Sequence, residues 1–297
     1  MRYEVFLIYL QFTPSSHLTP HTSHLPMEQY FSTIPSSHRA LILALGITFF
    51  WLLEGGIPLK KFVYGKWKHA SLNFFFTFTT ILINFLFAKL IVQASDWCQA
   101  NHFGIYHTIN TNFLSRVSPF SSLVSCLSSL LLLDLISAYL IHWIEHKIKW
   151  MWRFHMIHHS DTYVDTTTAN RHHPGESVFR AIFTLLAVYV IGAPIWLVMM
   201  YQSISVVLSQ FNHANISLPE KVDKAISWII VSPNMHKIHH HYMQPETDSN
   251  YGNIFSIWDR LFGTYREMDL SKLKYGLDIL PDEEAENWGK QLRRPFS

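Results

Sequence analysis

Histidine is the residue through which this sequence could do chemistry, since 19 of its 297 residues are histidine. Eight of them form three short runs with spacings of three or four residues: His142 and His146; His155, His158 and His159; His236, His239 and His240. Residues at these spacings lie on one face of a helix, so each run offers its imidazoles to a single point. Imidazole binds iron, zinc, copper and nickel. Chance placement gives about 0.1 copies of the HxxHH spacing in such a chain, so its two copies predict a metal site.

Other histidines differ in how well their surroundings suit a ligand. His173, in the loop after the second run, and His213, at the end of an apolar stretch, are further candidate ligands. His241 turns away from the ligand face, because one residue rotates a helix by about 100°. Seven other histidines are isolated or lie where no helical pattern exists, and we expect them to bind no metal: His17, His21, His24, His38, His69, His102 and His107.

Long apolar stretches must position these histidines. Only 15% of the residues are charged, against about 25% in soluble domains. Residues 40–53, 72–92 and 123–143 approach the length of about 20 residues that spans a bilayer. Residues 178–211 are also apolar but are broken by Gly192 and Pro194, which predicts a helical hairpin. We therefore expect an all-α integral membrane bundle of about three spans plus a hairpin, with a histidine-rich cap.

The chain divides into four parts by composition. Residues 1–39 predict a poorly ordered leader, in which the apolar stretch 5–12 is too short to span a membrane and Met27 could serve as the start. Residues 40–122 hold the first spans, and residues 123–266 form the expected catalytic domain. Residues 267–297 are rich in acids and predict a solvated polar tail. Asp134 lies inside the third span, so we expect it to face the protein interior and orient a neighbour.

Basic residues predict the orientation of the spans. They cluster in the loop between the first two spans and again after the third span: Lys60, Lys61, Lys66 and Lys68; Lys147, Lys149, Arg153 and Arg171. Only Arg116 lies between spans two and three. The positive-inside rule therefore predicts that the histidine runs and the C-terminus are cytoplasmic.

Composition argues against other classes of site. The net charge of +2 and the lack of a basic stripe give no indication of nucleic acid as a partner. Cys98 and Cys126 do not form a CxxC pair, so a cysteine-type zinc site is not expected.

The order of the histidine runs resembles that of the fatty acid hydroxylase/sterol desaturase superfamily, in particular bacterial sterol desaturase-like members, with some resemblance to alkylglycerol monooxygenase. Five strings carry the resemblance: WRFHMIHHSD (152–161), TTANRHHPGE (167–176), QFNHAN (210–215), SPNMHKIHHH (232–241) and TDSNYGNIFSIWDRLFGTY (247–265). The resemblance implies that the three runs are catalytic metal ligands. It adds His173, not His172, through the RxHP string, and His213 through QFNH. Trp143 departs from the arginine that follows the first ligand in many members.

The resemblance also implies the chemistry. Ten histidines would hold two non-haem iron ions, and O2 would oxidise a fatty acyl, sterol or alkyl-ether lipid by hydroxylation, desaturation or ether cleavage. Glu145, Glu176, Asp134, Asp161 and Asn234 are expected to act behind the ligands, for example by fixing imidazole tautomers. The sequence contains no GxGxxG fingerprint and no haem or iron–sulfur motif. A separate reductase, ferredoxin, cytochrome or reduced pterin must then supply two electrons.

Two alternatives use the same histidines differently. A zinc-dependent membrane hydrolase would need only three protein ligands and an open water site, and no general base beside an HExxH-like motif is present. A metal transporter or sensor would place its ligands near the bilayer midplane, whereas these runs follow the ends of spans.

Overall fold

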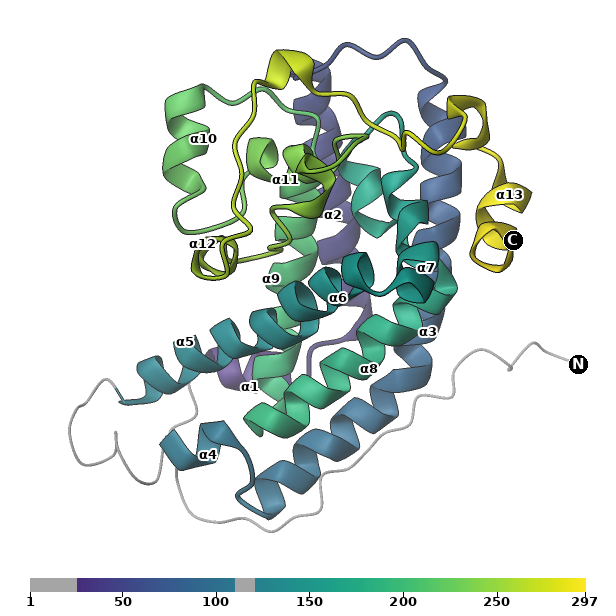
Figure 1. Cartoon of the computed structure of the whole chain (residues 1–297). Coiled ribbons are helices and arrows are strands. Elements are labelled where there is room, and N and C mark those ends of the chain that lie inside the picture. Colours follow the sequence, from purple (N-terminus) through teal and green to yellow (C-terminus); the bar gives the residue numbers. More distant parts are fainter. Residues whose placement is uncertain (1–25, 110–120) are drawn as a thin grey trace, which may run out of the picture.

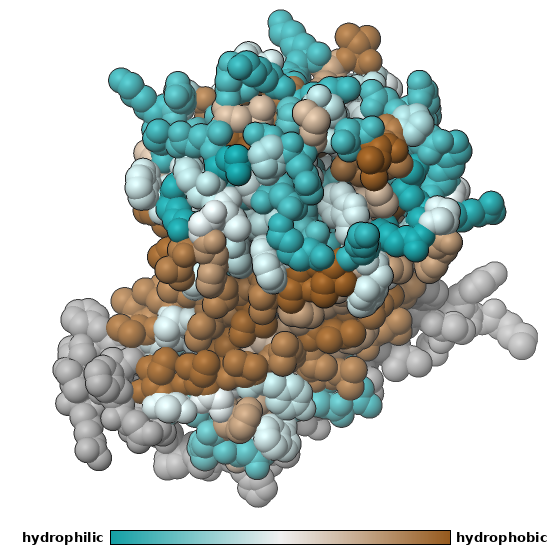
Figure 2. All heavy atoms as spheres, in the orientation of Figure 1, coloured by the Kyte–Doolittle hydropathy of each residue, from teal (hydrophilic) through white to brown (hydrophobic). Residues whose placement is uncertain are grey.

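The computed structural model describes residues 26–109 and 121–297, and this part of the chain is all-helical. A polar cap rests on an apolar helical layer, which forms a continuous brown band beneath the cap in Figure 2. Four helical segments are long and apolar enough to cross a membrane: Ser36–Gly56, Lys66–Ile109, Leu123–Lys147 and Pro174–Ile191. These segments indicate an integral membrane protein.

The first two spans are helices α2 (Ser36–Gly56) and α3 (Lys66–Ala100), preceded by the short α1 (Pro26–Ser32) and followed by α4 (Ile105–Ile109). Helix α3 descends from the cap to the far end of the apolar layer (Figure 1). The leader predicted over residues 1–39 is therefore wrong for its last part, because α1 and the start of α2 are helical there. Residues 1–25, with the 5–12 stretch, lie outside the described residues.

The third span changes helix type just before the first histidine run. Helix α5 (Ser121–Asp134) leads into the π-helix η2 (Leu135–Leu140), which continues into α6 (Ile141–Lys147). π-Helical turns are rare in proteins, and those that occur are often found at functional sites. Asp134 faces the interior as predicted, but its partners are not histidines. Its carboxylate accepts hydrogen bonds from two backbone groups, Ile254 N and Phe255 N, and from the indole Nε1 of Trp258. It therefore fixes the loop after the third histidine run to this span.

The hairpin predicted over residues 178–211 is confirmed as helices α8 (Pro174–Ile191) and α9 (Ile195–His213). Gly192 caps α8 with a φ of +69°, and a Cβ there would lie 2.0 Å from the Phe103 carbonyl oxygen. Only glycine meets both demands without strain. Pro194 then occupies the N-cap of α9 in the extended conformation that is usual at this position. The hairpin returns the chain to the cap at His213.

Short helices build the cap: α7 (Lys149–His159), η3 (Thr166–Asn170), α10 (Glu220–Ile226), α11 (Pro233–His239), η4 (Glu246–Asp248), α12 (Ile257–Leu261), η5 (Leu270–Lys272), η6 (Asp282–Glu284), α13 (Trp288–Arg293) and η7 (Arg294–Phe296). Helix α11 begins with the side chain of Ser232 accepting a hydrogen bond from Met235 N, with proline in the first turn. This start is a strong local signal for a helix, and it fixes the direction of the third histidine run.

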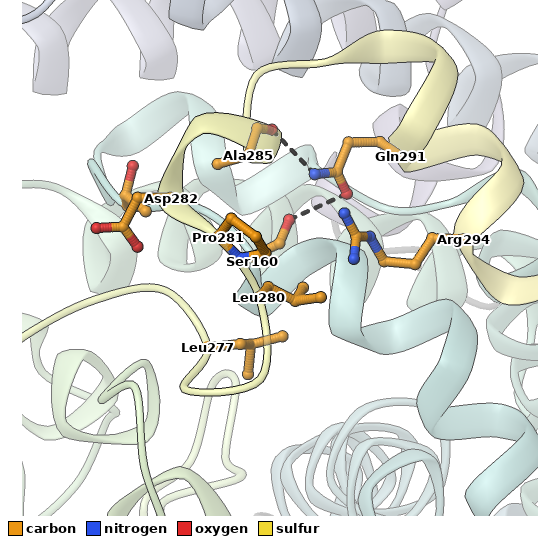
Figure 3. Close-up of a pocket in the computed structure, with 9 residues that line it drawn as sticks. Ser160, Leu277, Leu280, Pro281, Asp282, Ala285, Gln291 and Arg294 are labelled. Carbon is orange, nitrogen blue, oxygen red and sulfur yellow. Dashed lines mark hydrogen bonds between the residues drawn. The ribbon is translucent and has the colours of Figure 1, made fainter. Parts of the chain in front are cut away.

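The predicted solvated tail is a packed part of the cap. Leu273, Tyr275 and Leu277 are buried, and the amide of Gln291 bridges the Ser160 hydroxyl and the Ala285 carbonyl (Figure 3). Acidic residues misled the prediction, because they alternate with apolar residues that reach the cap core. The tail therefore covers α7, which carries the second histidine run.

Candidate metal centre

Four elements bring nine of the ten predicted ligands together. His142 and His146 lie on α6, and His155, His158 and His159 lie on α7. His213 is the last residue of α9, while α11 contributes His236 and His239 and is capped by His240. Apart from His146, which is partly buried, these residues are fully buried. The membrane spans thus end where the cap helices supply their ligands.

The nine histidines form two groups, in which one nitrogen from each member lies within 4.8 Å of the others. Group one contains His142, His146, His155, His159 and His239. Group two contains His158, His213, His236 and His240. Each HxxHH run therefore serves both groups. The prediction that each run points to a single site is wrong for these two runs.

The division follows from helix geometry. Residues i and i+4 are rotated by about 40° and residues i and i+3 by about 60° in the opposite sense. The i and i+4 members, His155 and His159, enter group one, and the i+3 member, His158, enters group two. In the third run the assignment is reversed: His236 and His240 enter group two and His239 enters group one. Each run therefore straddles both groups.

Hydrogen bonds fix the protonation of several rings. In group one, the Nδ1 atoms donate to oxygen acceptors: His142 to the Tyr251 carbonyl at 2.8 Å, His155 to Glu176 at 2.8 Å, and His239 to the Ser249 carbonyl at 2.7 Å. In group two, His213 Nδ1 faces the Ser209 carbonyl at 2.8 Å. A neutral imidazole has one N–H, so the Nε2 atom of each of these rings carries a lone pair.

In group one these lone pairs face one another across a distance that suits a cation, and in group two the Nε2 atoms of three further rings surround the lone pair of His213. His142 Nε2 and His155 Nε2 are 3.1 Å apart, and His213 Nε2 lies 3.1 Å from His158, 3.1 Å from His236 and 3.2 Å from His240. Two lone pairs cannot share a hydrogen bond. Ligands at right angles around an ion, with metal–nitrogen distances of about 2.1 Å, stand about 3.0 Å apart. Both groups therefore fit a metal ion.

Two further observations support this fit. His146 Nε2 and His239 Nε2 are buried and find no hydrogen-bond partner among the described residues. Burial also lowers the pKa of His155 to about 3 and holds the pKa values of His159 and His240 well below the ordinary range. These rings are therefore neutral at pH 7, which is the form that binds metals.

A buried ionic network supports group one. Glu176 accepts hydrogen bonds from His155 Nδ1 at 2.8 Å and from Arg180 Nε at 3.0 Å. Arg180 also donates to Glu145 at 2.6 Å. The expectation that Glu145 and Glu176 stand behind the ligands agrees with these positions. Arg180 was missed. It lies four residues after Glu176 on an apolar helix, and this spacing could have indicated an ion pair between the two side chains.

The cap surface supplies another acceptor for group one. Asp248 lies 3.2 Å from His146 Nδ1 and 2.6 Å from Lys147 Nζ. Burial opposes ionisation, but the hydrogen bonds from His146 and Lys147 outweigh it and lower the pKa of Asp248. Asp248 thus remains a carboxylate that orients His146. Asp248 was missed because, although it lies only eight residues after His240, it orients a histidine of the first run.

His173, the tenth predicted ligand, does not reach either group. Its Nδ1 accepts a hydrogen bond from Gly175 N at 3.0 Å, and its Nε2 faces the Leu292 carbonyl at 3.2 Å. Both ring nitrogens are therefore used, and the residue serves as the N-cap of α8. Its neighbour His172 lies closer, with its ring stacked on His158 at 4.8 Å and its Nδ1 2.6 Å from Glu176. His172 Nε2 faces the Ala169 carbonyl at 3.1 Å, so neither residue joins the two groups.

The other polar candidates lie outside both groups. His241 Nδ1 accepts from Lys274 N at 3.2 Å, which agrees with its exclusion. Asp161 accepts from Thr168 Oγ1 at 2.8 Å, and Asn234 donates its backbone N–H to Asp223. Neither orients a histidine of the two groups. His17, His21 and His24 are outside the described residues.

A cavity of about 500 Å³ connects the histidines with the apolar layer. His158, His213 and His236 of group two line it, together with His142 of group one, and it continues between α2, α3, α8 and α9. A cavity of this size falls within the range of small-molecule sites. A molecule entering from the apolar layer would therefore meet the histidines at the cap end.

Comparisons with known proteins point to one family. A fatty acid hydroxylase family model matches residues 127–264, the segment that holds all nine histidines of the two groups. The ornithine lipid hydroxylase OlsE of Rhizobium tropici is 26% identical over 54% of this chain and 46% of its own length. The alkylglycerol monooxygenase of Caenorhabditis elegans is 31% identical over 43% of this chain and 24% of its own.

A third relative, the cholesterol 25-hydroxylase-like protein 1, member 2 of Danio rerio, is 28% identical over 48% of this chain and 51% of its own length. The chain thus matches about half or less of each of these relatives. No solved structure matches. The family model spans the two histidine groups, and it shows that residues 127–264 of this chain form a fatty acid hydroxylase domain.

Proposed function

We propose that this protein is a membrane di-iron oxygenase that uses O2 and two external electrons to hydroxylate, desaturate or oxidatively cleave a lipid. One observation carries the proposal: two adjacent groups of buried, neutral imidazoles present lone pairs at ligand spacing, and a cavity leads from them into the apolar layer. The family and the printed activities of the relatives support lipid oxidation.

Group one would hold one iron ion through His142, His146, His155, His159 and His239, and group two the other through His158, His213, His236 and His240. Iron at these positions would supply the oxidising power to break a C–H bond. The protein's own part is to position and to exclude: the spans hold a lipid chain in the cavity, and the closed cap keeps bulk water from the histidines. Glu176, Asp248 and two backbone carbonyls fix the rings that face the metal.

The balance of the reaction defines its partners. Hydroxylation places one atom of O2 in the lipid and releases the other as water, which consumes two electrons and two protons. The chain offers no nucleotide fingerprint, so we propose that a separate electron-transfer protein or a reduced pterin supplies the electrons. We place the cap in the cytoplasm on the distribution of lysine and arginine.

The test combines metal content with oxygen labelling. Protein purified and reconstituted without air should bind about two iron ions per chain, one for each group. Membranes from an expressing host, supplied with reductant and 18O2, should yield lipids that carry label, gain a double bond or release an aldehyde, as scored by mass spectrometry. Matched membranes with the His239→Ala variant should yield none of these products, whereas His241→Ala should behave like the native protein. Turnover without O2, or label that enters from water, would establish a hydrolase instead.

A further inference from the structure

The wall of the cavity contains more polar side chains than a channel for hydrocarbon needs. Four helices of the apolar layer line it at helical spacing, and α3, α8 and α9 each contribute several polar residues. Polar side chains within membrane spans are costly and usually mark a functional site. Most of these have partners of their own. Thr77 and Thr184 donate to carbonyls one turn earlier, and Thr80 pairs with Ser177 at 2.9 Å.

Several cavity-lining side chains differ from this pattern, and three of them bring a guanidinium or an amide from helices α2, α3 and α9. Arg39 on α2, Asn84 on α3 and Gln202 on α9 all line the same cavity. Within residues 26–109 and 121–297, none of the three side chains has a hydrogen bond or an ion pair. They bring a guanidinium and two amides to the cavity. Arg39 and Asn84 are exposed and Gln202 is half-buried, but all three lie on apolar helices, where a polar group without a partner is costly in lipid.

Charge limits what the partner can be. The lining contains two cations and no carboxylate. One cation, Arg180, is already paired with Glu145 and Glu176. Arg39 has no such partner in the described chain, so a bound anion would complete it. Arginine is well suited to this task because its planar fork matches a carboxylate or a phosphate.

Size and position define the rest of the ligand. The volume of about 500 Å³ lies in the lower half of the range for small-molecule sites, and it suits a single chain better than a two-chain lipid. Gln202 precedes His213 on α9 by about 16 Å along the helix axis. Arg39 lies one turn before Leu43, whose carbonyl accepts from Gln210 Nε2 at 3.0 Å. The three free side chains and the histidines thus line separate parts of one cavity.

We propose that the cavity binds a single-chain amphiphile by its anionic headgroup, a carboxylate or a phosphate. Arg39 pairs with the anion, Asn84 and Gln202 hydrogen-bond to it, and the chain extends toward the histidines. The inference rests on the proposed function only where it calls this amphiphile the substrate, since binding itself needs no iron.

The test measures binding to the purified full-length protein in detergent, with and without metal. Oleate and methyl oleate have the same chain and differ in charge, and oleyl phosphate offers the other anion. Native mass spectrometry should show one oleate per chain, bound at least about tenfold more tightly than methyl oleate, as a charge-assisted hydrogen bond implies. Arg39→Gln should abolish this preference and leave methyl oleate binding unchanged, while Arg39→Lys should retain part of it. A higher affinity for oleyl phosphate than for oleate would assign a phosphate headgroup, and the reverse a carboxylate.

Lys89→Gln is the matched control, because Lys89 is an exposed cation on α3 that does not line the cavity. Equal affinity for oleate and methyl oleate in the native protein would overturn the proposal. So would an equal loss of preference in the Lys89→Gln and Arg39→Gln variants, which would reduce the effect to surface charge. Retained methyl oleate binding shows that a variant is folded. If anion binding holds but no O2-dependent oxidation is found, the headgroup site stands and the proposed function fails.

Discussion

The two histidine groups use the same side chain but differ in how the protein holds it. In group one, four of five rings have Nδ1 against an oxygen: the Tyr251 and Ser249 carbonyls, Asp248 and Glu176. In group two, His213 has such an acceptor, whereas His158 Nδ1 and His240 Nδ1 find none among the described residues. Group one is therefore fixed in orientation, and group two has rings that are free to adjust.

The groups also face different parts of the molecule. Trp152 is partly exposed, and its ring lies 4.9 Å from that of His146 and 5.4 Å from that of His159, so group one approaches the cap surface. Group two contributes three of its four rings to the wall of the cavity. We infer that the rigid group anchors the centre and that the adaptable group accommodates the bound molecule. Each prediction below tests one part of this difference.

The largest effects should follow loss of a central ligand from either group. His155 Nε2 lies 3.1 Å from both His142 and His159, and His213 Nε2 faces three rings. His155→Ala and His213→Ala should each abolish activity and lower bound iron from about two ions to about one. Iron analysis after reconstitution measures this, with His241→Ala as the control. Loss of both ions from either variant would mean that the groups do not act separately.

The sequence predicted the ligand types and missed their distribution. The spacing and recurrence of the runs identified eight of the nine residues that meet in space, and the end of the hairpin with its QFNH string identified the ninth, His213. What the spacing could not give is which residues share a metal, because that depends on how the two helices dock against each other. His158 and His239 therefore enter the group opposite to that of their run partners.

The errors have a common cause. His173 was chosen from a string that matches a family pattern, but its ring is consumed by capping α8 and by the Leu292 carbonyl. That carbonyl belongs to the C-terminal segment, which the acidic composition had predicted to be solvated. Asp248 and Arg180 were missed because their roles depend on contacts with distant residues. The length of the apolar stretches predicted the spans, and the break at Gly192 and Pro194 predicted the hairpin, since these depend on local sequence.

Removal of one carboxylate should have a smaller effect, confined to group one. Glu176→Gln keeps the shape of the side chain but removes the charge that His155 and Arg180 contact. We expect iron affinity at group one to fall by about 10- to 100-fold, as is usual for partners of ligating histidines. Chelator competition measures the affinity of each ion.

Asn212→Ser is the matched change in group two. Asn212 Oδ1 lies 2.6 Å from His213 Nδ1, but the Ser209 carbonyl at 2.8 Å remains as an acceptor. The affinity of group two should therefore change by less than that of group one does in Glu176→Gln. A larger loss from Asn212→Ser would contradict the view that group two depends less on fixed acceptors.

Acid should destabilise the metal-free protein through both groups alike. In the unfolded chain imidazole has a pKa of about 6.5, whereas burial lowers the pKa of His155 to about 3 and that of His236 well below its ordinary value. The unfolded state therefore takes up more protons as the pH falls, and stability should decline from about pH 6.5 downward. Thermal unfolding between pH 8 and pH 5 measures the slope.

The comparison is sharpened by removing one ring from each group. His159→Ala and His236→Ala should each make the slope shallower, and to a similar degree, because both rings are buried. An effect seen in one group only would show that the groups differ in burial and not merely in hydrogen bonding.

The smallest effect should come from the contact between α2 and α9, which supports group two alone. A Cβ on Gly46 would lie 1.9 Å from Gln210 Oε1, so Gly46→Ala must displace a side chain that donates to the Leu43 carbonyl. Loss of that hydrogen bond should lower the free energy of unfolding by about 1 kcal/mol and loosen the end of α9 that carries His213. Gly55→Ala, on the same helix, meets nothing within 4 Å and should be neutral or stabilising by up to about 1 kcal/mol. Thermal unfolding and the rate of metal release from each group separate the two variants. Faster release from group one in Gly46→Ala would contradict the assignment of this contact to group two, because no ligand of group one lies on α2 or α9.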